Sequence, residues 1–391
     1  MSSARERAGW LGAGAVCVAA VLAALGAALA LGAVCIPIAQ LPRPTGPFVV
    51  GTSVLVLGHD IPVQIWYPAA PGAAGGRAPY RFGVRAGPLR ARVTSALVQT
   101  DAWIDLPVAA GKHPVVLYAP AWGGTRYDNT VQTENLASYG YVVVAMDDLY
   151  ASRPMDMTSE QTFHATLQWA GDKVRLQAAA ARDILSALGR LRADGAQGRF
   201  AGHLDLRRAG MFGFSFGGAV AAQAAALDPR IRAAVDLDGW IFADAADPGV
   251  PRPFLIVSSS AQDSLAAARS APGDQRYSDI LDRTNLKQML DGLARYGGYY
   301  LTVSGTDHYN FSDVALLPSF RHTGVGPIDS RRAAAIVAAY LVQFFGRYLG
   351  GADAPLFEAR AGNGARAAAR RSMDSAGQLE IWRTPREASR P

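Results

Sequence analysis

Cysteine is scarce in this chain of 391 residues: there are two, Cys17 and Cys35, and both lie in one apolar run near the N-terminus. The rest of the chain therefore lacks a thiol for a catalytic cysteine, for a zinc site with cysteine ligands or for a disulfide. Two cysteines cannot cross-link a chain of this length, so a small disulfide-stabilised fold is excluded.

Charged side chains are also few, at 18% of the residues, while 50% of the residues are hydrophobic, which excludes disorder throughout the chain. The formal net charge is +6, but most of it lies in residues 1–7 and 360–391, so residues 8–359 are nearly neutral. Because that central part has no basic stripe with interleaved aromatic residues, nucleic acid is not an expected partner.

A long apolar run, residues 10–39, contains no charged or strongly polar side chain. A helix of about 20 residues crosses a bilayer core, so the run is long enough to span one. It also exceeds the ~7–15 apolar residues of a removable secretory signal. A retained signal-anchor is therefore favoured over a cleaved signal peptide, with a buried core helix as the third alternative. Cleavage stays open because residues 28–30, Ala-Leu-Ala, have the small-x-small pattern of signal peptidase sites.

Basic residues before this run, Arg5 and Arg7, favour a cytoplasmic N-terminus, residues 1–9, with the bulk of the protein outside the cytoplasm. Membrane attachment is then expected through residues 10–39, and the protein would be secreted if that segment is cleaved. Lipid modification of Cys35 is less favoured, because a valine precedes it where a small residue would be expected.

The remainder of the chain shows strand and helix patterns in alternation. Residues 48–57 and 61–67 are typical of a hairpin around the turn 58–60, Gly-His-Asp, and residues 70–90, rich in Gly, Pro and Arg, of a surface loop. From residue 114 onward, the predicted strands are residues 115–118, 141–146, 210–214, 231–236, 254–258 and 299–303, and the predicted helices are 166–191, 216–227, 285–296 and 329–349.

Apolar strands separated by helices indicate a parallel sheet covered on both faces. We find no internal repeat and no domain-sized linker, so a single α/β domain over residues 45–350 is expected. Residues 351–391 are predicted to be a poorly ordered C-terminal tail, in which Leu379, Ile381 and Trp382 could dock as a short strand.

Residues 213–217 read Gly-Phe-Ser-Phe-Gly and fit the Gly-x-Ser-x-Gly pattern of a nucleophile elbow. The pattern alone is weakly specific in a chain with 41 glycines, but here it directly follows an apolar strand and directly precedes a helical run. The chemistry needs a serine on a strained strand-to-helix turn, where the helix N-terminus places partial positive charge beside an oxyanion. Ser215 is therefore the predicted nucleophile, and the structural alternative is a glycine-rich helix cap.

A serine hydroxyl needs a base, and in folds of this chain order the histidine comes late. His308 closely follows the last predicted strand of the sheet and is the predicted base, with His322 as the alternative. The other four histidines precede Ser215; they are His59, His113, His164 and His203.

The acid has two candidate positions when strand order alone is considered. Asp238 follows the strand 231–236, and Asp263 follows the next strand. Asp236 is expected to be embedded in its strand, and Asp307 to point elsewhere because it adjoins the histidine.

Three blocks together resemble the plasma-type platelet-activating-factor acetylhydrolase family, whose members are calcium-independent serine phospholipases with the α/β-hydrolase fold. The blocks are residues 213–218, Gly-Phe-Ser-Phe-Gly-Gly, residues 237–242, Leu-Asp-Gly-Trp-Ile-Phe, and residues 304–313, Ser-Gly-Thr-Asp-His-Tyr-Asn-Phe-Ser-Asp. The resemblance is diffuse between the blocks and spans about residues 45–350. It implies a mostly parallel central sheet with helices on both faces, after the N-terminal helix.

The family's triad carries over to Ser215, Asp238 and His308, which favours Asp238 over Asp263. Its oxyanion hole carries over to the backbone N–H groups of Phe216 and Trp122. Residues 119–121, Ala-Pro-Ala, depart from the family's usual Ser-His-Gly, a change that keeps the backbone donor but can alter pocket shape and acyl preference.

The function implied by the resemblance is a serine carboxylic-ester hydrolase that releases short acyl chains from phospholipid-type or related lipid esters through an acyl-enzyme. Alternatives on the same fold are a general carboxylesterase, a polyester hydrolase or an acyltransferase, and beyond enzymes a non-catalytic binding protein. No metal or cofactor is expected, and the sequence favours no oligomeric state. Trp240, Ile241 and Phe242 either line an acyl-facing groove or pack in the core.

Overall fold

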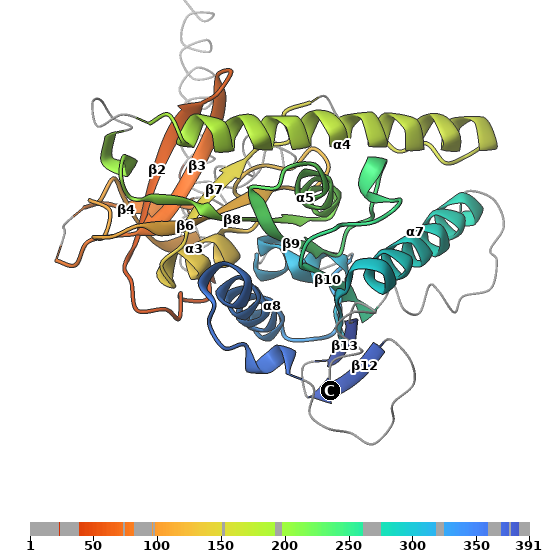
Figure 1. Ribbon diagram of the computed structural model, residues 1–391. Helices are drawn as coiled ribbons and strands as arrows, with labels where there is room; N and C mark the ends of the chain where they lie inside the picture. Colours follow the sequence, from red (N-terminus) through yellow and green to blue (C-terminus); the bar gives the residue numbers. More distant parts are fainter. Residues whose placement is uncertain are drawn as a thin grey trace, which may run out of the picture.

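The computed structural model describes residues 39–72, 75–81, 98–150, 153–191, 198–260, 275–317, 324–358, 369–374 and 377–382, together with Ala23 and Ala96. The predicted membrane or signal segment, residues 10–39, therefore lies outside the described residues, except for Ala23 and for Ala39, which opens a short strand. The described chain forms one large sheet flanked by helices (Figure 1).

Six parallel strands form the centre of the sheet, in the order β7, β6, β8, β9, β10, β11. Their bounds are β6 His113–Ala119, β7 Val142–Met146, β8 Leu204–Phe214, β9 Ile231–Leu237, β10 Phe254–Ser259 and β11 Gly298–Val303. Because helices cover both faces, these strands contain runs of buried apolar residues instead of an alternating pattern. All six predicted strands are found, although β8 begins earlier than expected.

Further strands extend the sheet on both sides, mostly through antiparallel pairing. β2 (Val50–Leu57) and β3 (Ile61–Pro68) form the predicted hairpin, and β3 pairs with β7. Beyond them lie β5 (Val98–Ile104), β1 (Ala39–Gln40) and β4 (Arg77–Pro79). The prediction of a loop throughout residues 70–90 was wrong at β4, which pairs with β5. At the opposite edge β13 (Gly377–Trp382) pairs with β11, and β12 (Ala369–Asp374) with β13, so part of the predicted tail belongs to the sheet.

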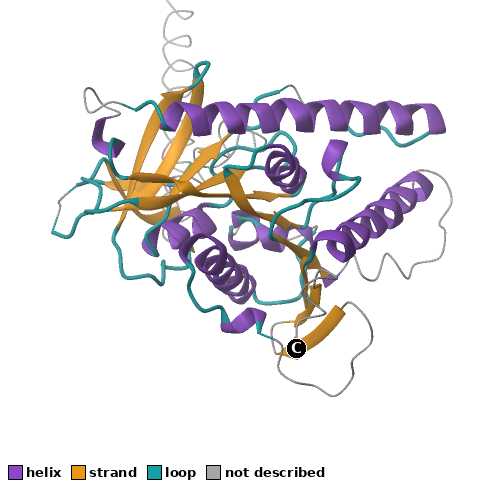
Figure 2. Ribbon diagram, viewed as in Figure 1, coloured by secondary structure: helices purple, strands orange, loops and turns teal. Residues whose placement is uncertain are grey.

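Helices cover the two faces of the sheet (Figure 2). α4 (Glu160–Leu188) and α5 (Phe216–Leu227) pack together on one face, and α3 (Thr130–Ser138) and α8 (Ser330–Phe345) on the other (Figure 1). α7 (Gln275–Tyr296) shares the core of α4 and α5, and a second core lies under α8. Short 3₁₀ helices occur at Gly198–Phe200, Ala243–Ala245, His308–Phe311, Asp313–Leu316 and Pro355–Phe357, and a π-helix at Gly346–Gly350.

Helix starts differ most from the prediction. α4 begins at Glu160 because the hydroxyl of Ser159 accepts the backbone N–H of Thr162 at 3.2 Å and so caps the helix before its apolar face begins. α7 begins at Gln275, ahead of the predicted residue 285. α3 was not predicted, because its buried residues are mostly polar and show no apolar stripe.

Within the described part of the chain, one helical stretch, Ser330–Gly350, is long and apolar enough to cross a membrane by length and composition. Half of its most apolar window is buried inside the fold, and residues of α8 belong to the core under the sheet. This stretch therefore has the burial of a core helix.

Candidate active site

Ser215 forms the turn between β8 and α5, with a backbone φ of 55° and ψ of −122°. Such a conformation costs a residue with a side chain on the order of 1–3 kcal/mol, so the surroundings must hold it. The N–H of Ser215 donates to the carbonyl oxygen of Leu237 at 2.8 Å, and the carbonyl oxygen of Ser215 accepts the N–H of Gly218 at 2.8 Å. The turn is thus tied both to the neighbouring strand β9 and to its own helix.

Glycines around Ser215 are required by close backbone contacts. A Cβ on Gly217 would lie 2.0 Å from the carbonyl oxygen of Ala119 in β6, and one on Gly213 would lie 1.9 Å from the carbonyl oxygen of Gly217. A Cβ on Gly218 would lie 1.7 Å from Oδ1 of Asp236. The pattern of residues 213–218 therefore reflects the tight packing of α5 against the strand ends.

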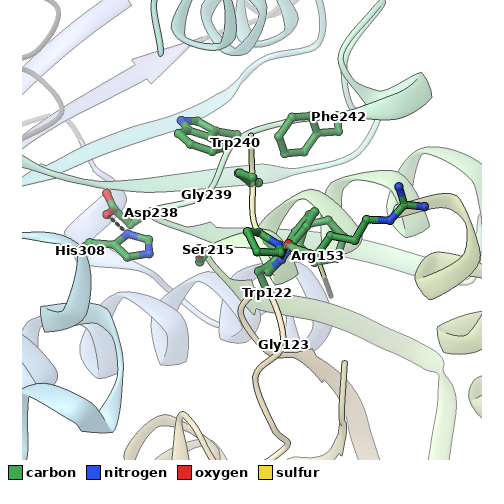
Figure 3. A pocket seen from close by; sticks show the side chains of 12 residues that line it. Trp122, Gly123, Arg153, Ser215, Asp238, Gly239, Trp240, Phe242 and His308 are labelled. Carbon is green, nitrogen blue, oxygen red and sulfur yellow. Dashed lines mark hydrogen bonds and ion pairs between the residues drawn. The ribbon is translucent and has the colours of Figure 1, made fainter. Parts of the chain in front are cut away.

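The predicted acid and base lie against each other. Oδ2 of Asp238 is 2.7 Å from Nδ1 of His308, and Oδ1 of Asp238 accepts the N–H of Ser259 at 2.6 Å. The carboxylate is shielded from water, since the Asp238 side chain is 1% exposed, whereas the His308 side chain is 35% exposed. In Figure 3 the imidazole lies between Asp238 and Ser215. The ring of Phe214 packs on the imidazole with 4.9 Å between ring centroids.

The loop after β11 orients the histidine. Oδ1 of Asp307 accepts the N–H of His308 at 2.7 Å, so this carboxylate caps the short helix His308–Phe311. Oδ1 of Asn310 accepts the N–H groups of Asp307 at 2.8 Å and Gly326 at 2.7 Å. These bonds fix the backbone from which the imidazole projects.

Ser215, Asp238 and His308 line one cavity of about 730 Å³ (Figure 3). The other lining residues are mainly apolar; they are Trp122, Gly123, Arg153, Pro154, Met155, Phe216, Gly239, Trp240 and Phe242. The alternatives for residues 240–242 therefore divide by residue. Trp240 lines the cavity, Phe242 lines it and is also part of the core, and Ile241 is 3% exposed and belongs to the core without lining the cavity.

The two predicted oxyanion-hole residues also line the cavity. Phe216 is the first residue of α5, and Trp122 lies in the loop after β6. Neither backbone N–H has a hydrogen-bond acceptor among the described residues. The two rings pack edge to face with 4.9 Å between centroids. Because a helix N-terminus carries partial positive charge, the N–H of Phe216 is suited to an oxygen that becomes negative.

A second carboxyl group, that of Asp236, lies beneath the turn and is completely buried. Burial raises its pKa well above the ordinary value, and the charge of nearby Asp238 acts in the same direction. Its Oδ1 accepts the N–H of Gly239 at 2.9 Å. The two acids of this strand end therefore have different environments: Asp238 contacts the imidazole, and Asp236, strand-embedded as predicted, supports the backbone.

The alternative acid and base, Asp263 and His322, lie outside the described residues. The four earlier histidines are described and do not line the cavity. In the part of the chain that the structure describes, no group of three or more His, Cys, Asp or Glu residues could hold a metal ion.

Sequence reasoning missed a buried ion pair next to the loop of Trp122. Nζ of Lys173 lies 2.6 Å from Oδ2 of Asp148, and both side chains are almost completely buried. A signal was present in the sequence, because Lys173 falls on the apolar face of α4 between Ala170 and Val174. A lysine at such a position is rarely buried without a partner.

Comparison with known proteins adds family information. Residues 100–270 match the model of the dienelactone hydrolase family, and residues 194–354 match that of platelet-activating factor acetylhydrolase, isoform II. Among solved structures, a ferulic acid esterase from Streptomyces cinnamoneus superposes with a TM-score of 0.59 at 25% sequence identity, covering 82% of this chain and 96% of that chain. No curated protein matches.

Both matched families consist of α/β-hydrolase serine esterases, and the chain is similar to both over these residues. The resemblance to the platelet-activating-factor acetylhydrolase family is confirmed by the match over residues 194–354, which contains all three blocks that suggested it. The predicted α/β-hydrolase fold is likewise supported by the mixed sheet, its flanking helices and the solved esterase.

Proposed function

We propose that the protein is a serine carboxylic-ester hydrolase whose catalytic residues are Ser215, Asp238 and His308. The observation that carries the proposal is the contact of 2.7 Å between Asp238 and His308 in the same cavity as a serine on a strained turn. The matches to two esterase families support it. A carboxylate bound to one imidazole nitrogen leaves the other nitrogen for the serine proton, as nucleophilic acyl transfer requires.

In the proposed reaction, Oγ of Ser215 attacks the ester carbonyl carbon while Nε2 of His308 takes the hydroxyl proton. Nδ1–H of His308 donates to Asp238, which stabilises the imidazolium. The backbone N–H groups of Phe216 and Trp122 hold the oxyanion. His308 then gives its proton to the leaving alcohol, and it later activates the water that attacks the acyl-enzyme and releases the acid.

We infer that the substrates are short acyl esters of phospholipid-type or related lipids. The match of residues 194–354 supports this substrate class. The walls of the cavity support it too, because Met155, Trp240 and Phe242 offer apolar surface beside the proposed nucleophile. Apolar surface removed from water contributes roughly 25 cal/mol per Å², so such walls favour a lipid-like group.

An ester of a small aromatic acid is the second candidate, within a general carboxylesterase activity. The solved structure that superposes on the chain is a ferulic acid esterase, and the alignment covers 96% of it. Trp122, Trp240 and Phe242 give the cavity ring faces against which an aromatic acyl group can pack.

Labelling with a fluorophosphonate tests the nucleophile. We expect the wild-type protein to be labelled on Ser215, and Ser215→Ala to lose both labelling and ester hydrolysis, because the attacking oxygen is removed. Ser186→Ala is the matched control on α4, where the hydroxyl donates to the carbonyl oxygen of Arg182, and it should retain both properties. Labelling that persists in Ser215→Ala would assign the nucleophile to another residue.

A substrate panel separates the two candidates. The panel contains nitrophenyl esters of graded acyl length, a short-acyl phosphatidylcholine and methyl ferulate. The highest kcat/KM on the phospholipid supports the lipid ester, and the highest on methyl ferulate supports the aromatic ester. Turnover of nitrophenyl esters alone would contradict both substrate classes and leave a general carboxylesterase.

We propose further that residues 10–39 export the catalytic domain and hold it at the membrane, or release it if they are cleaved. The charge-free run and the preceding Arg5 and Arg7 support this proposal. Fractionation of cells that express the full chain tests it: a carbonate-resistant membrane fraction indicates an anchor. A secreted form that begins shortly after Ala30 indicates cleavage, and activity confined to the soluble cytoplasmic fraction would refute both.

A further inference from the structure

The ion pair between Lys173 and Asp148 lies directly beneath the cavity wall. Lys173 projects from α4 and Asp148 follows β7, and the two side chains are 2% and 1% exposed. Taking two charges out of water costs several kcal/mol per ion, and a buried pair is often no more stabilising than apolar residues of the same volume. Stability alone is therefore a weak explanation for charges at this position.

The ammonium group of Lys173 is surrounded by aromatic rings. Its Nζ lies 4.5 Å from the ring centroid of Trp122, 5.2 Å from that of Phe216 and 5.4 Å from that of Trp169. These distances are typical of cation–π contacts, which are strongest where water is excluded. Trp122 and Phe216 are the two residues whose backbone N–H groups are proposed to hold the oxyanion.

Asp148 contacts the same loop through its backbone and its side chain. Its Oδ2 accepts the N–H of Gly123, the residue after Trp122, and its own N–H donates to the carbonyl oxygen of Gly124 at 3.2 Å. The indole Nε1 of Trp122 donates to the carbonyl oxygen of Arg153 at 2.9 Å. The position of the Trp122 backbone is therefore determined on both sides, by its ring and by the following peptide.

Gln177, one helical turn after Lys173, continues this connection between α4 and the segment after β7. Its Nε2 donates to the carbonyl oxygen of Asp147 at 2.6 Å, and its Oε1 accepts the N–H of Leu149 at 3.3 Å. Residues four apart share one face of a helix, so α4 holds the residues on either side of Asp148 and Asp148 itself.

We propose that Lys173 and Asp148 are positioning residues that hold the loop of Trp122 so that its backbone N–H points at the oxyanion. This inference rests on the proposed function. Because the two opposite charges cancel, the pair acts through geometry and not through a net field. A donor that is already in position stabilises the transition state more than one that must reorient during the reaction. Removal of one oxyanion donor lowers kcat about 10²- to 10³-fold in other hydrolases.

The main test is Lys173→Met/Asp148→Leu, which removes both charges without leaving one unpaired. We expect kcat to fall about 10- to 100-fold, less than for loss of the donor itself, and KM to change less than about threefold. The inhibition constant of a trifluoromethyl ketone, which forms a tetrahedral adduct, should rise by about the same factor as kcat falls. If the pair had a purely structural role, its replacement would lower the melting temperature without a matching fall in kcat and rise in the inhibition constant.

Arg182→Met is the control on the same helix, because Arg182 pairs with Asp228 at 3.4 Å and does not line the cavity. It should retain wild-type kcat and inhibitor affinity.

If the Met/Leu variant does not fold, Lys173→Gln/Asp148→Asn replaces it, and a loss of at least about threefold in kcat is expected from the weaker neutral hydrogen bonds. A folded variant with unchanged kcat and inhibitor affinity overturns the inference. Wild-type labelling on Ser215 separates that result from failure of the proposed function.

Discussion

Asp236 and Asp238 are two residues apart, yet burial and contacts give them different chemistry. Asp238 contacts the imidazole of His308, whereas the raised pKa of Asp236 favours its neutral form. We expect Asp238→Asn to lower kcat about 10³- to 10⁴-fold, because an amide no longer stabilises the imidazolium. Asp236→Asn keeps an acceptor for the N–H of Gly239 and should retain most of the activity. Hydrolysis of a soluble ester, measured for both variants, checks this contrast, and equal losses would contradict it.

The three proposed catalytic residues could be predicted from sequence patterns, whereas some of the residues that surround them could not. Ser215 was recognisable because its glycines reflect backbone contacts that any such turn requires. Strand order alone left Asp238 and Asp263 as equal candidates, and the preference came from the family resemblance. The pair of Lys173 and Asp148 has no motif, because its partners come together only when α4 packs beside the end of β7.

At the scale of elements, the packing of α5 against β6 gives a sharp prediction. Gly217→Ala would place a Cβ 2.0 Å from the carbonyl oxygen of Ala119, and this atom belongs to backbone that cannot move aside. We expect loss of activity and a lower melting temperature, because overpacking of this kind costs about 1–3 kcal/mol of stability. Gly350→Ala is the control, since its Cβ would meet no atom within 4 Å. Wild-type melting and activity in Gly217→Ala would show that the strand and helix can separate.

The boundaries of helices and strands were predictable where an apolar pattern begins or ends. They were not predictable where polar contacts determine the first or last residue. The start of α4 depends on the cap at Ser159, and α3 is buried through polar residues that lack an apolar period. The π-helix that follows α8 is likewise not visible in the hydropathy of residues 329–349. The parallel strands at the centre of the sheet were easier to predict, because burial on both faces makes each strand an apolar run in the sequence.

At the scale of the whole molecule, the sequence predicted an α/β fold with a parallel centre, and this is the observed architecture. It did not predict how far the sheet extends. A short strand at residues 379–382 was anticipated and is found as β13, but β4, β5 and β12 were not predicted. They join through long-range pairing, in which the partner strand, and not the local pattern, determines the structure.

Buried carboxyl groups should make the stability of the whole fold depend on pH. Glu134 on α3 is 1% exposed, and burial raises its pKa from the ordinary 4.5 to about 8. Burial likewise raises the pKa of Asp313 to about 7. Between its ordinary pKa and its raised pKa, each of these two carboxyl groups therefore binds a proton more readily in the folded state than in the unfolded state. Stability is greatest below the unfolded pKa values and falls as pH rises toward 8, by up to about 1.4 kcal/mol per pH unit for each proton.

Glu134→Gln tests this dependence, because glutamine resembles the protonated acid at every pH. Melting temperatures are measured from pH 5 to pH 9, which is about one pH unit above the raised pKa of Glu134. They should decline less steeply with rising pH in the variant than in the wild type. Part of the decline should remain, owing to Asp313. Glu160→Gln, at an exposed position on α4 with a side chain 80% exposed, should follow the wild-type curve. Parallel curves for Glu134→Gln and the wild type would mean that Glu134 does not hold its proton in the folded state.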